Sequence, residues 1–185
     1  MKRFFDFVLS LSALIIIFLP LTIIYLLVLI TSSRPVIYWS KRVGKNNKLF
    51  MMPKFRTMKK HTPELPTDKL IKPEQWWTPL GKILRKTSLD ELPQLWCVLN
   101  GEMSLIGPRP CLQSQEILIN KRNKLGIQKL RPGITGWAQI NGRDNISELE
   151  KVNYDSYYLK NYSLKLDLKI FFITIYKVLK LEGVS

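Results

Sequence analysis

The feature that most constrains the fold is an uncharged, mostly apolar run of 27 residues from Phe7 to Ser33. It is long enough to cross a bilayer, and it is too long for the apolar part of a signal peptide. Pro20 lies at its midpoint, where a proline interrupts the helical hydrogen bonds and kinks the helix. Each arm would then reach roughly 20 Å, which is less than the ~30 Å hydrocarbon core. The run is therefore either a kinked span or a re-entrant hairpin.

Basic residues flank the run on both sides, with Lys2 and Arg3 before it and Arg34 and Lys41 after it. Positive flanks prefer the cytoplasmic side, and a single span would export one of them. This favours the hairpin, although prolines are also tolerated in spanning helices, so the residues alone leave both topologies open. Either topology leaves the remainder of the chain in the cytoplasm.

The net charge of +15 is unevenly distributed, because residues 34–63 hold nine Lys or Arg and no Asp or Glu. Such a stretch suits either nucleic acid phosphates or an anionic membrane surface. It begins where the apolar run ends, and no nucleic-acid-binding motif accompanies it. We therefore expect membrane lipids as partners and no nucleic acid. The length fits residues 1–33 in the membrane and one compact domain over residues 34–185.

Few residues are available for metal-thiolate or histidine chemistry. Cys97 and Cys111 lack metal-ligand spacing and would stay reduced in the cytosol. His61 is the single histidine, which leaves almost no material for a zinc site or a Ser-His-Asp triad. Neither a GxGxxG motif nor a P-loop is present, so a nucleotide would have to be held in another way.

A β-hairpin is predicted after the basic stretch begins. Residues 36–41 and 49–58 are β-rich, and residues 44–47 (Gly-Lys-Asn-Asn) form the turn between them. Lys54 and Arg56 alternate with a phenylalanine on the second strand, so they should share one face.

Several helices are predicted by their N-terminal residues. Thr78 followed by proline is typical of a helix start. Ser147 and Glu150 have the spacing of a capping box, which should open a helix through Tyr158. Residues 163–180 mix apolar residues with lysines and predict an amphipathic helix, packed either on the core or at the membrane interface.

The adjacent carboxylates Asp90 and Glu91 are the strongest candidates for chemistry. Ser88 and Glu91 have capping-box spacing, which predicts a helix with Ser88 as N-cap. One apolar stripe would then be formed by Leu92, Leu95, Trp96 and Leu99. Asp90 would point away from it, toward solvent or a cleft. Pro93 fits better if Asp90 is the cap. Taken alone, an acidic pair in a first helical turn is more often structural than catalytic.

The surrounding motifs change this interpretation. They occur in order along nearly the whole chain: Lys41–Gly44, Lys54–Met58, Ser88–Leu95, Gly101–Ser104, Gly107–Pro110, Arg131–Gly136 and Asn141–Arg143. In this order they resemble the bacterial polyprenyl-phosphate phosphoglycosyltransferases of the small monotopic type. One departure is Leu19, because this family commonly has a serine before the proline of its broken helix.

The resemblance implies an α+β fold with a re-entrant N-terminal helix, a short antiparallel hairpin, and helices lying on the membrane plane. It places the catalytic domain on the cytoplasmic face of the bacterial inner membrane. The implied reaction transfers a sugar 1-phosphate from a UDP-sugar to polyprenyl phosphate and releases UMP. Asp90 would be the nucleophile and would also bind Mg²⁺. Glu91 would accept a proton from the lipid phosphate or position another group.

Five basic residues are expected to bind the substrate phosphates: Lys54, Arg56, Arg85, Arg109 and Arg143. Arginine suits bidentate contacts to phosphate, although each could instead form an ordinary surface ion pair. Gly133 and Gly136 are candidates either for backbone contacts to an anion or for a turn. Two other functions remain open, a Mg²⁺-dependent membrane phosphatase and a basic membrane adaptor without chemistry.

Overall fold

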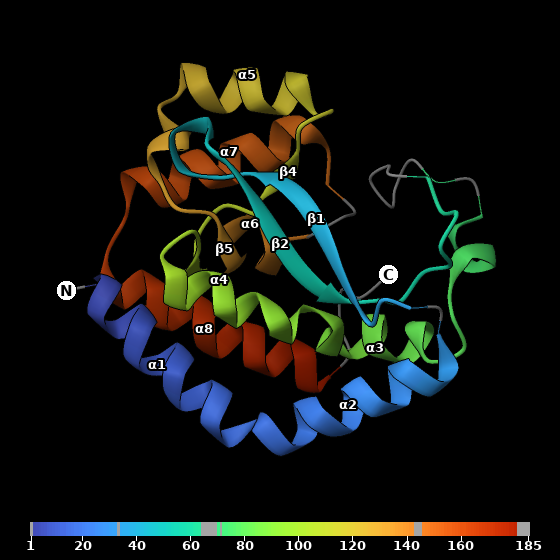
Figure 1. The fold of residues 1–185 in the computed structure, drawn as a ribbon. Coiled ribbons are helices and arrows are strands. Elements are labelled where there is room, and N and C mark those ends of the chain that lie inside the picture. Colours follow the sequence, from blue (N-terminus) through green and yellow to red (C-terminus); the bar gives the residue numbers. More distant parts are fainter. Residues whose placement is uncertain (1, 33, 64–69, 71, 143–145, 181–185) are drawn as a thin grey trace.

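The structure is a computed structural model that describes residues 2–32, 34–63, 70, 72–142 and 146–180. Its N-terminal part is a pair of helices, α1 (Lys2–Ile16) and α2 (Phe18–Thr31), which meet at an angle of 63° (Figure 1). Neither helix alone is long and apolar enough to cross a membrane, but the bent pair together meets that criterion. Pro20 lies in the first turn of α2, where its missing N–H is not needed. The predicted break is therefore confirmed, with Leu19 before the proline.

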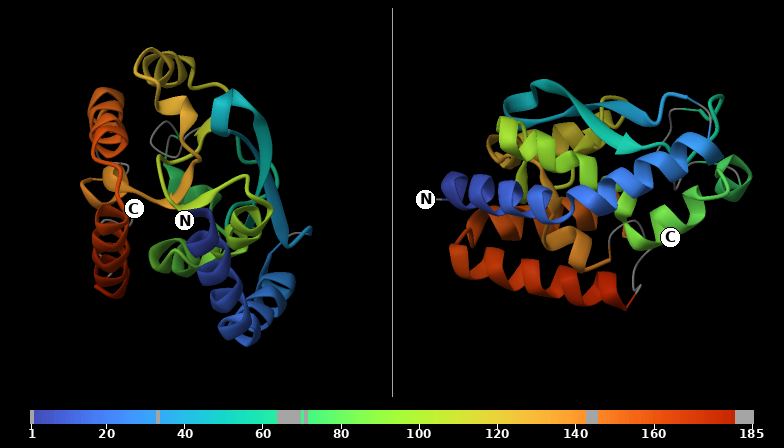
Figure 2. Two further views of the ribbon diagram at one scale, coloured as in Figure 1. Left: turned by 90° about the vertical axis from the view of Figure 1, so that its left-hand side faces the viewer. Right: turned by 60° about the horizontal axis from the view of Figure 1, so that its bottom comes forward.

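Both ends of this pair are attached to the rest of the protein. Near the start of α1, Lys2 donates hydrogen bonds to Tyr158 and to Asp167. Farther along the pair, Ile24 and Val28 of α2 pack into a cluster with Val36, Phe55 and Leu84. Figure 2 shows the bent pair lying along one side of the domain rather than projecting from it.

The predicted β-hairpin is confirmed and belongs to a three-stranded antiparallel sheet. Strands β1 (Ile37–Val43) and β2 (Leu49–Phe55) pair along their whole length, and the short strand β4 (Cys111–Leu112) pairs with the other edge of β1. A 3-10 turn, η1 (Lys45–Asn47), joins β1 to β2. The second strand ends at Phe55, short of Met58, and β4 was not predicted.

A second, parallel pair joins β3 (Ser104–Ile106) to β5 (Gly133–Thr135). Two glycines bring these segments together. A Cβ atom at Gly133 would lie 2.1 Å from the Gly107 nitrogen, and one at Gly136 would lie 2.0 Å from the Gly107 oxygen. The Gly133 N–H already donates to the Pro108 carbonyl at 2.9 Å. Close packing, rather than contact with an anion, accounts for Gly133.

The remaining elements are helices that surround the two sheets (Figure 1). They are η3 (Pro73–Trp76), α3 (Gly81–Thr87), η4 (Leu89–Gln94), α4 (Leu95–Asn100), α5 (Glu116–Lys124), η5 (Ile127–Lys129), α6 (Trp137–Ile140), α7 (Glu148–Lys160) and α8 (Leu164–Leu179). The capping box of Ser147 and Glu150 is confirmed at the start of α7. Helix α3 begins at Gly81, whose N–H donates to the Thr78 hydroxyl at 3.1 Å. Thr78 thus closes the turn that leads into α3.

Helix α8 has two apolar faces with different surroundings. Ile170 is fully buried in a cluster with Ile106, Ile140 and Tyr158, so one face packs on the core. Most of its exposed apolar residues lie three or four positions apart (Leu164, Leu168, Phe172, Tyr176 and Leu179), and Ile175 and Val178 are also exposed. The first of the two expected roles, packing on the core, is confirmed, and the exposed stripe leaves a surface suited to lipid.

Candidate active site

The segment that carries the two adjacent carboxylates is a 3-10 helix, so the predicted capping box is wrong, although Ser88 does occupy the N-cap position. Ser88 has left-handed backbone angles (φ 57°, ψ 16°) and makes no capping hydrogen bond with its side chain. Asp90, the alternative cap, lies inside η4. Pro93 has no N–H to donate to the carbonyl four residues earlier, so an α-helix is not favoured before α4.

The 3-10 segment also breaks the predicted apolar stripe. Leu95 is buried, whereas Trp96 is 55% exposed. Because a 3-10 helix has three residues per turn, it shifts the register of the faces before α4 begins. The same geometry buries both carboxylates, with Asp90 5% and Glu91 7% exposed. Of the two predicted surroundings of Asp90, solvent or a cleft, the structure shows the second, because Asp90 lines a cavity.

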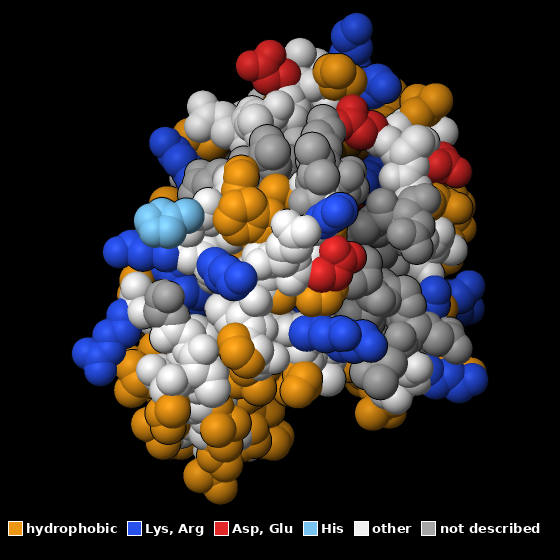
Figure 3. Space-filling model, turned by 90° about the vertical axis from the view of Figure 1, so that its right-hand side faces the viewer, with side chains coloured by type: hydrophobic (Ala, Val, Ile, Leu, Met, Phe, Trp, Pro, Cys, Tyr) orange, Lys and Arg blue, Asp and Glu red, His pale blue; other side chains and the backbone are white. Residues whose placement is uncertain are grey.

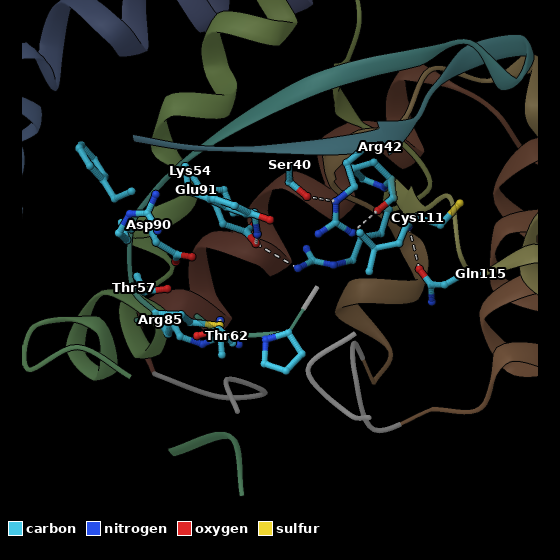
Figure 4. A pocket seen from close by; sticks show the side chains of 18 of the residues that line it. Ser40, Arg42, Lys54, Thr57, Thr62, Arg85, Asp90, Glu91, Cys111 and Gln115 are labelled. Atoms are coloured by element: carbon cyan, nitrogen blue, oxygen red, sulfur yellow. Dashed lines mark hydrogen bonds and ion pairs between the residues drawn. The ribbon is translucent and has the colours of Figure 1, made fainter. Parts of the chain in front are cut away.

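Glu91 is held by two cations from different parts of the chain. Its Oε1 accepts hydrogen bonds from Lys54 Nζ at 2.7 Å and from Arg109 Nη2 at 3.0 Å (Figure 4). Lys54 lies on β2, and Arg109 lies in the loop that follows β3. Both ion pairs are charge-assisted hydrogen bonds, so they fix the orientation of the Glu91 carboxylate.

Asp90 is in a different electrostatic state from its neighbour. No ion pair or hydrogen bond engages its carboxylate within the described ranges of the chain. Burial raises the pKa of Asp90, and the nearby Lys54 charge opposes that increase. Burial likewise lowers the pKa of Lys54, with Glu91 acting in the opposite direction. Asp90 is therefore a buried carboxylate whose oxygens are available to a ligand.

The carboxylates line a cavity of about 360 Å³. Its walls come from β1, β2, η4, the Arg109 loop and helices α5 to α7. Basic side chains predominate among its charged residues: Arg42, Lys54, Arg56, Lys59, Lys60, Arg85, Arg109, Arg122 and Lys151. A cavity with this lining suits an anionic substrate that carries several negative charges.

Four of the five predicted phosphate-binding residues line this cavity: Lys54, Arg56, Arg85 and Arg109. Arg56 donates from Nε to the Pro35 carbonyl at 2.7 Å. The fifth, Arg143, lies outside the described residues. The structure thus brings together side chains from β2, the segment after β2, α3 and the Arg109 loop.

Arg42 was not predicted as a site residue, although it belongs to the Lys41–Gly44 motif. It lines the cavity from β1 and donates from Nε to the Ser40 hydroxyl at 2.9 Å. Burial, together with the nearby Arg109, lowers the pKa of Arg42 to about 10. Alternation along β1 places Ser40 and Arg42 on one face, and this pattern could have identified them.

The described part of the chain holds no cluster of three or more His, Cys, Asp or Glu residues that could form an all-protein metal site. Cys97 and Cys111 are free and buried. A hard divalent cation could still bind here through one carboxylate and the phosphates of a substrate, since Mg²⁺ is commonly held in that way.

The candidate site thus consists of two adjacent buried carboxylates in a cavity lined mainly by basic side chains, in a chain that also carries a bent apolar helix pair. Residues 1–181 match the model of the bacterial sugar transferase family, and the chain belongs to that family. It is 41% identical to the uncharacterized sugar transferase EpsL of Bacillus subtilis (strain 168) over 191 residues, covering 100% of this chain and 90% of EpsL.

Two larger relatives carry more specific names. The UDP-glucose:undecaprenyl-phosphate glucose-1-phosphate transferase of Klebsiella pneumoniae is 42% identical over 95% of this chain and 39% of its own length. The undecaprenyl-phosphate galactose phosphotransferase of Salmonella typhimurium is 39% identical over 99% of this chain and 41% of its own length. The chain thus spans nearly all of EpsL and less than half of each larger relative.

Proposed function

We propose that the protein transfers a sugar 1-phosphate from a UDP-sugar to undecaprenyl phosphate, giving the undecaprenyl diphosphate-linked sugar and UMP. The observation that carries this proposal is the division between the two carboxylates. Glu91 is neutralised by Lys54 and Arg109, whereas the Asp90 oxygens face the basic cavity without a partner among the described residues. Family membership and the names of the larger relatives support the same reaction.

In the first half-reaction, an Asp90 oxygen attacks the phosphorus that carries the sugar. The bond from that phosphorus to the bridging oxygen breaks, and its electron pair leaves with UMP. The product is an acyl phosphate between Asp90 and the sugar phosphate, which divides one difficult displacement into two. Asp90 is suited to this role because none of the described residues forms an ion pair or hydrogen bond with its oxygens, so their lone pairs are available.

In the second half-reaction, an oxygen of the lipid phosphate attacks the same phosphorus and releases the Asp90 carboxylate. Glu91 then serves as a positioning group, because its ion pairs with Lys54 and Arg109 fix the orientation of its carboxylate. The cations around it stabilise negative charge on the transferring phosphate. We assign this binding role to Lys54, Arg56, Arg85, Arg109 and, on the resemblance alone, Arg143.

Mg²⁺ fits the donor set at Asp90. The residue supplies a hard carboxylate oxygen facing the cavity, and a diphosphate would supply further oxygen ligands, as this ion requires. When bound, the metal would neutralise diphosphate charge and favour departure of UMP. Asp90 is the residue that would hold the ion.

The contacts of the bent helix pair support a re-entrant arrangement. Helix α1 starts with Lys2 bonded to Tyr158 and Asp167, and α2 leads directly into β1 of the same domain. A full span would place these two ends on opposite sides of the bilayer. We therefore propose that residues 1–33 dip into the inner membrane and that residues 34–185 form the catalytic domain on its cytoplasmic face.

The surface of the protein supports this orientation. Hydrophobic side chains cover the lower end of the face in Figure 3, where the bent pair lies, and Lys and Arg border them above. Exposed apolar residues of the pair include Ile16, Phe18, Leu19 and Ile30. Basic residues beside an apolar surface suit the anionic headgroups of the cytoplasmic leaflet. In this orientation the cavity would lie near the lipid phosphate that accepts the sugar.

The direct test is to incubate the protein in lipid nanodiscs with undecaprenyl phosphate and a panel of UDP-sugars. The panel includes UDP-glucose and UDP-galactose, because the two larger relatives are named for different sugars. We expect UMP and a lipid-linked sugar in equal amounts, and neither with Asp90→Asn. Free sugar 1-phosphate without a lipid product would instead indicate a phosphatase. An inert protein whose Asp90→Asn form still performs its cellular role would indicate an adaptor.

A further inference from the structure

Arg122 links a buried carboxylate to the main chain of the Arg109 loop. Its Nε and Nη2 donate to Asp155 Oδ2 at 3.0 and 2.6 Å, and its Nη1 donates to the Arg109 carbonyl at 2.9 Å. Asp155 lies on α7, Arg122 on α5, and the Asp155 side chain is only 2% exposed. One planar guanidinium thus connects two helices to the residue whose side chain holds Glu91.

The loop around Arg109 is also held on either side. The Pro108 carbonyl accepts from the Gly133 N–H at 2.9 Å, and the Leu112 N–H donates to Gln115 Oε1 at 2.9 Å. Between these two points, the bond from Arg122 fixes the peptide that follows the Arg109 Cα. On the other side of the same residue, the Arg109 guanidinium reaches Glu91 at 3.0 Å. The direction of the Arg109 side chain therefore depends on the peptide that Arg122 holds.

Stability alone does not explain why a charge pair is placed here. Burying two ions carries a large desolvation penalty, and well-packed apolar residues of similar volume are often as stable or more so. An arginine, however, donates in a fixed plane to several acceptors at once, which a lysine or an apolar residue cannot do. The Asp155–Arg122 pair thus supplies a defined direction for the third hydrogen bond.

We propose that Asp155, acting through Arg122, is a positioning residue that orients Arg109 toward the diphosphate of the nucleotide sugar. This inference rests on the proposed function, in which Arg109 binds that diphosphate. Misplacing a binding group by about 1 Å can reduce a rate roughly a hundredfold. Loss of the pair should therefore weaken binding and transfer through Arg109, even though Asp155 touches no substrate.

A double-mutant cycle in the full-length protein tests the coupling. The variants Asp155→Asn and Arg122→Lys are prepared with Arg109 intact and in an Arg109→Lys background. UDP affinity, kcat/KM for the UDP-sugar and melting temperature are measured for each. With Arg109 intact, we expect kcat/KM to fall and the Kd for UDP to rise by roughly tenfold or more. In the Arg109→Lys background, the same changes should alter either quantity by less than about twofold.

Arg131→Lys is the matched control. Arg131 also donates to a backbone carbonyl, from its Nε to the Gly101 oxygen at 2.8 Å, but it does not line the cavity. It should leave UDP affinity close to wild type. Equal losses from Asp155→Asn in both Arg109 backgrounds would overturn the inference, because the pair would then act as general scaffold. Losses from Arg122→Lys that persist without Arg109 would also overturn it, since Arg122 would then contact the nucleotide directly.

Two further outcomes separate this inference from the proposed function. Wild-type affinity in both variants, with Arg109→Lys alone weakening UDP, would refute the positioning role and leave the function intact. A wild-type protein that neither binds UDP nor releases UMP would refute the function itself. If neither Asp155→Asn nor Arg122→Lys folds, the pair is a structural ion pair and the positioning role is rejected.

Discussion

Asp90→Asn and Glu91→Gln should affect stability differently, although the two residues are adjacent. Burial raises the pKa of Asp90, so its charged form is less well accommodated in the folded protein than in the unfolded chain. A neutral amide of the same size removes that unfavourable charge and disrupts no hydrogen bond with the described residues. We expect Asp90→Asn to fold with a melting temperature equal to or above that of the wild type at pH 7.

Glu91→Gln removes the shared partner of two cations. Lys54 Nζ at 2.7 Å and Arg109 Nη2 at 3.0 Å would both lose their anionic partner, and the Lys54 side chain is only 17% exposed. Removing one member of a buried ion pair costs about 3–5 kcal/mol. Arg109 is one-third exposed, which favours the low end, about 3 kcal/mol. At this chain length, that corresponds to a melting temperature lower by roughly 6–12 °C.

The chemical readout is UMP release from enzyme and UDP-sugar without lipid acceptor. The wild type should give a burst stoichiometric with enzyme, and kinetics with both substrates should be ping-pong. Asp90→Asn should show neither burst nor turnover, whereas Glu91→Gln should lose turnover and keep part of the burst. Near-normal turnover by a folded Asp90→Asn protein would refute the nucleophile assignment. Equal destabilisation by the two substitutions would refute the electrostatic reasoning.

Three further outcomes are expected. Chelation with EDTA should abolish the burst and Mn²⁺ should partly restore it, so full activity in EDTA would contradict a metal at Asp90. The burst rate should fall as the pH decreases, with a midpoint above the usual carboxyl range, because burial raises the pKa of Asp90. Lys54→Met removes a positive charge that lowers this pKa, so it should move the midpoint to higher pH. An unchanged midpoint would contradict the electrostatic coupling between Lys54 and Asp90. Cysteines introduced as Phe4→Cys and Lys45→Cys should react with an impermeant maleimide only after permeabilisation. Labelling of the first alone in intact cells would mean a full span.

The parts of the fold that were predicted correctly depend on short-range chemistry. The capping box of Ser147 and Glu150 involves residues three apart, and the hairpin turn follows from a short polar sequence between two β-rich runs. Pro20 interrupts a helix whatever surrounds it. In each case the determining contacts lie within a few residues, so the sequence pattern and the structure agree.

The errors arose where distant segments decide the outcome. Ser88 occupies the N-cap position, but the predicted capping box does not form, because η4 packs against β2 and takes a 3-10 conformation that suits Pro93 and the buried carboxylates. Strand β4 is two residues long and has no pattern of its own, because its pairing is set by β1. The link between Arg122 and Asp155 joins residues 33 apart on different helices. No local periodicity encodes such a pairing.

The carboxylate pair shows most clearly why local patterns could not separate the surroundings of two neighbouring acids. By sequence, Asp90 and Glu91 are equivalent acidic residues at the start of a helix. Their difference comes from Lys54, 37 positions before Glu91, and Arg109, 18 positions after it, which both bind Glu91. One carboxylate is thereby held as an ion-pair anchor, and burial raises the pKa of the other. Environments that push apart the properties of two neighbouring acids are how a single site obtains two chemical roles. Exchanging the two residues, as Asp90→Glu with Glu91→Asp, should therefore abolish the burst although the net charge of the site is unchanged.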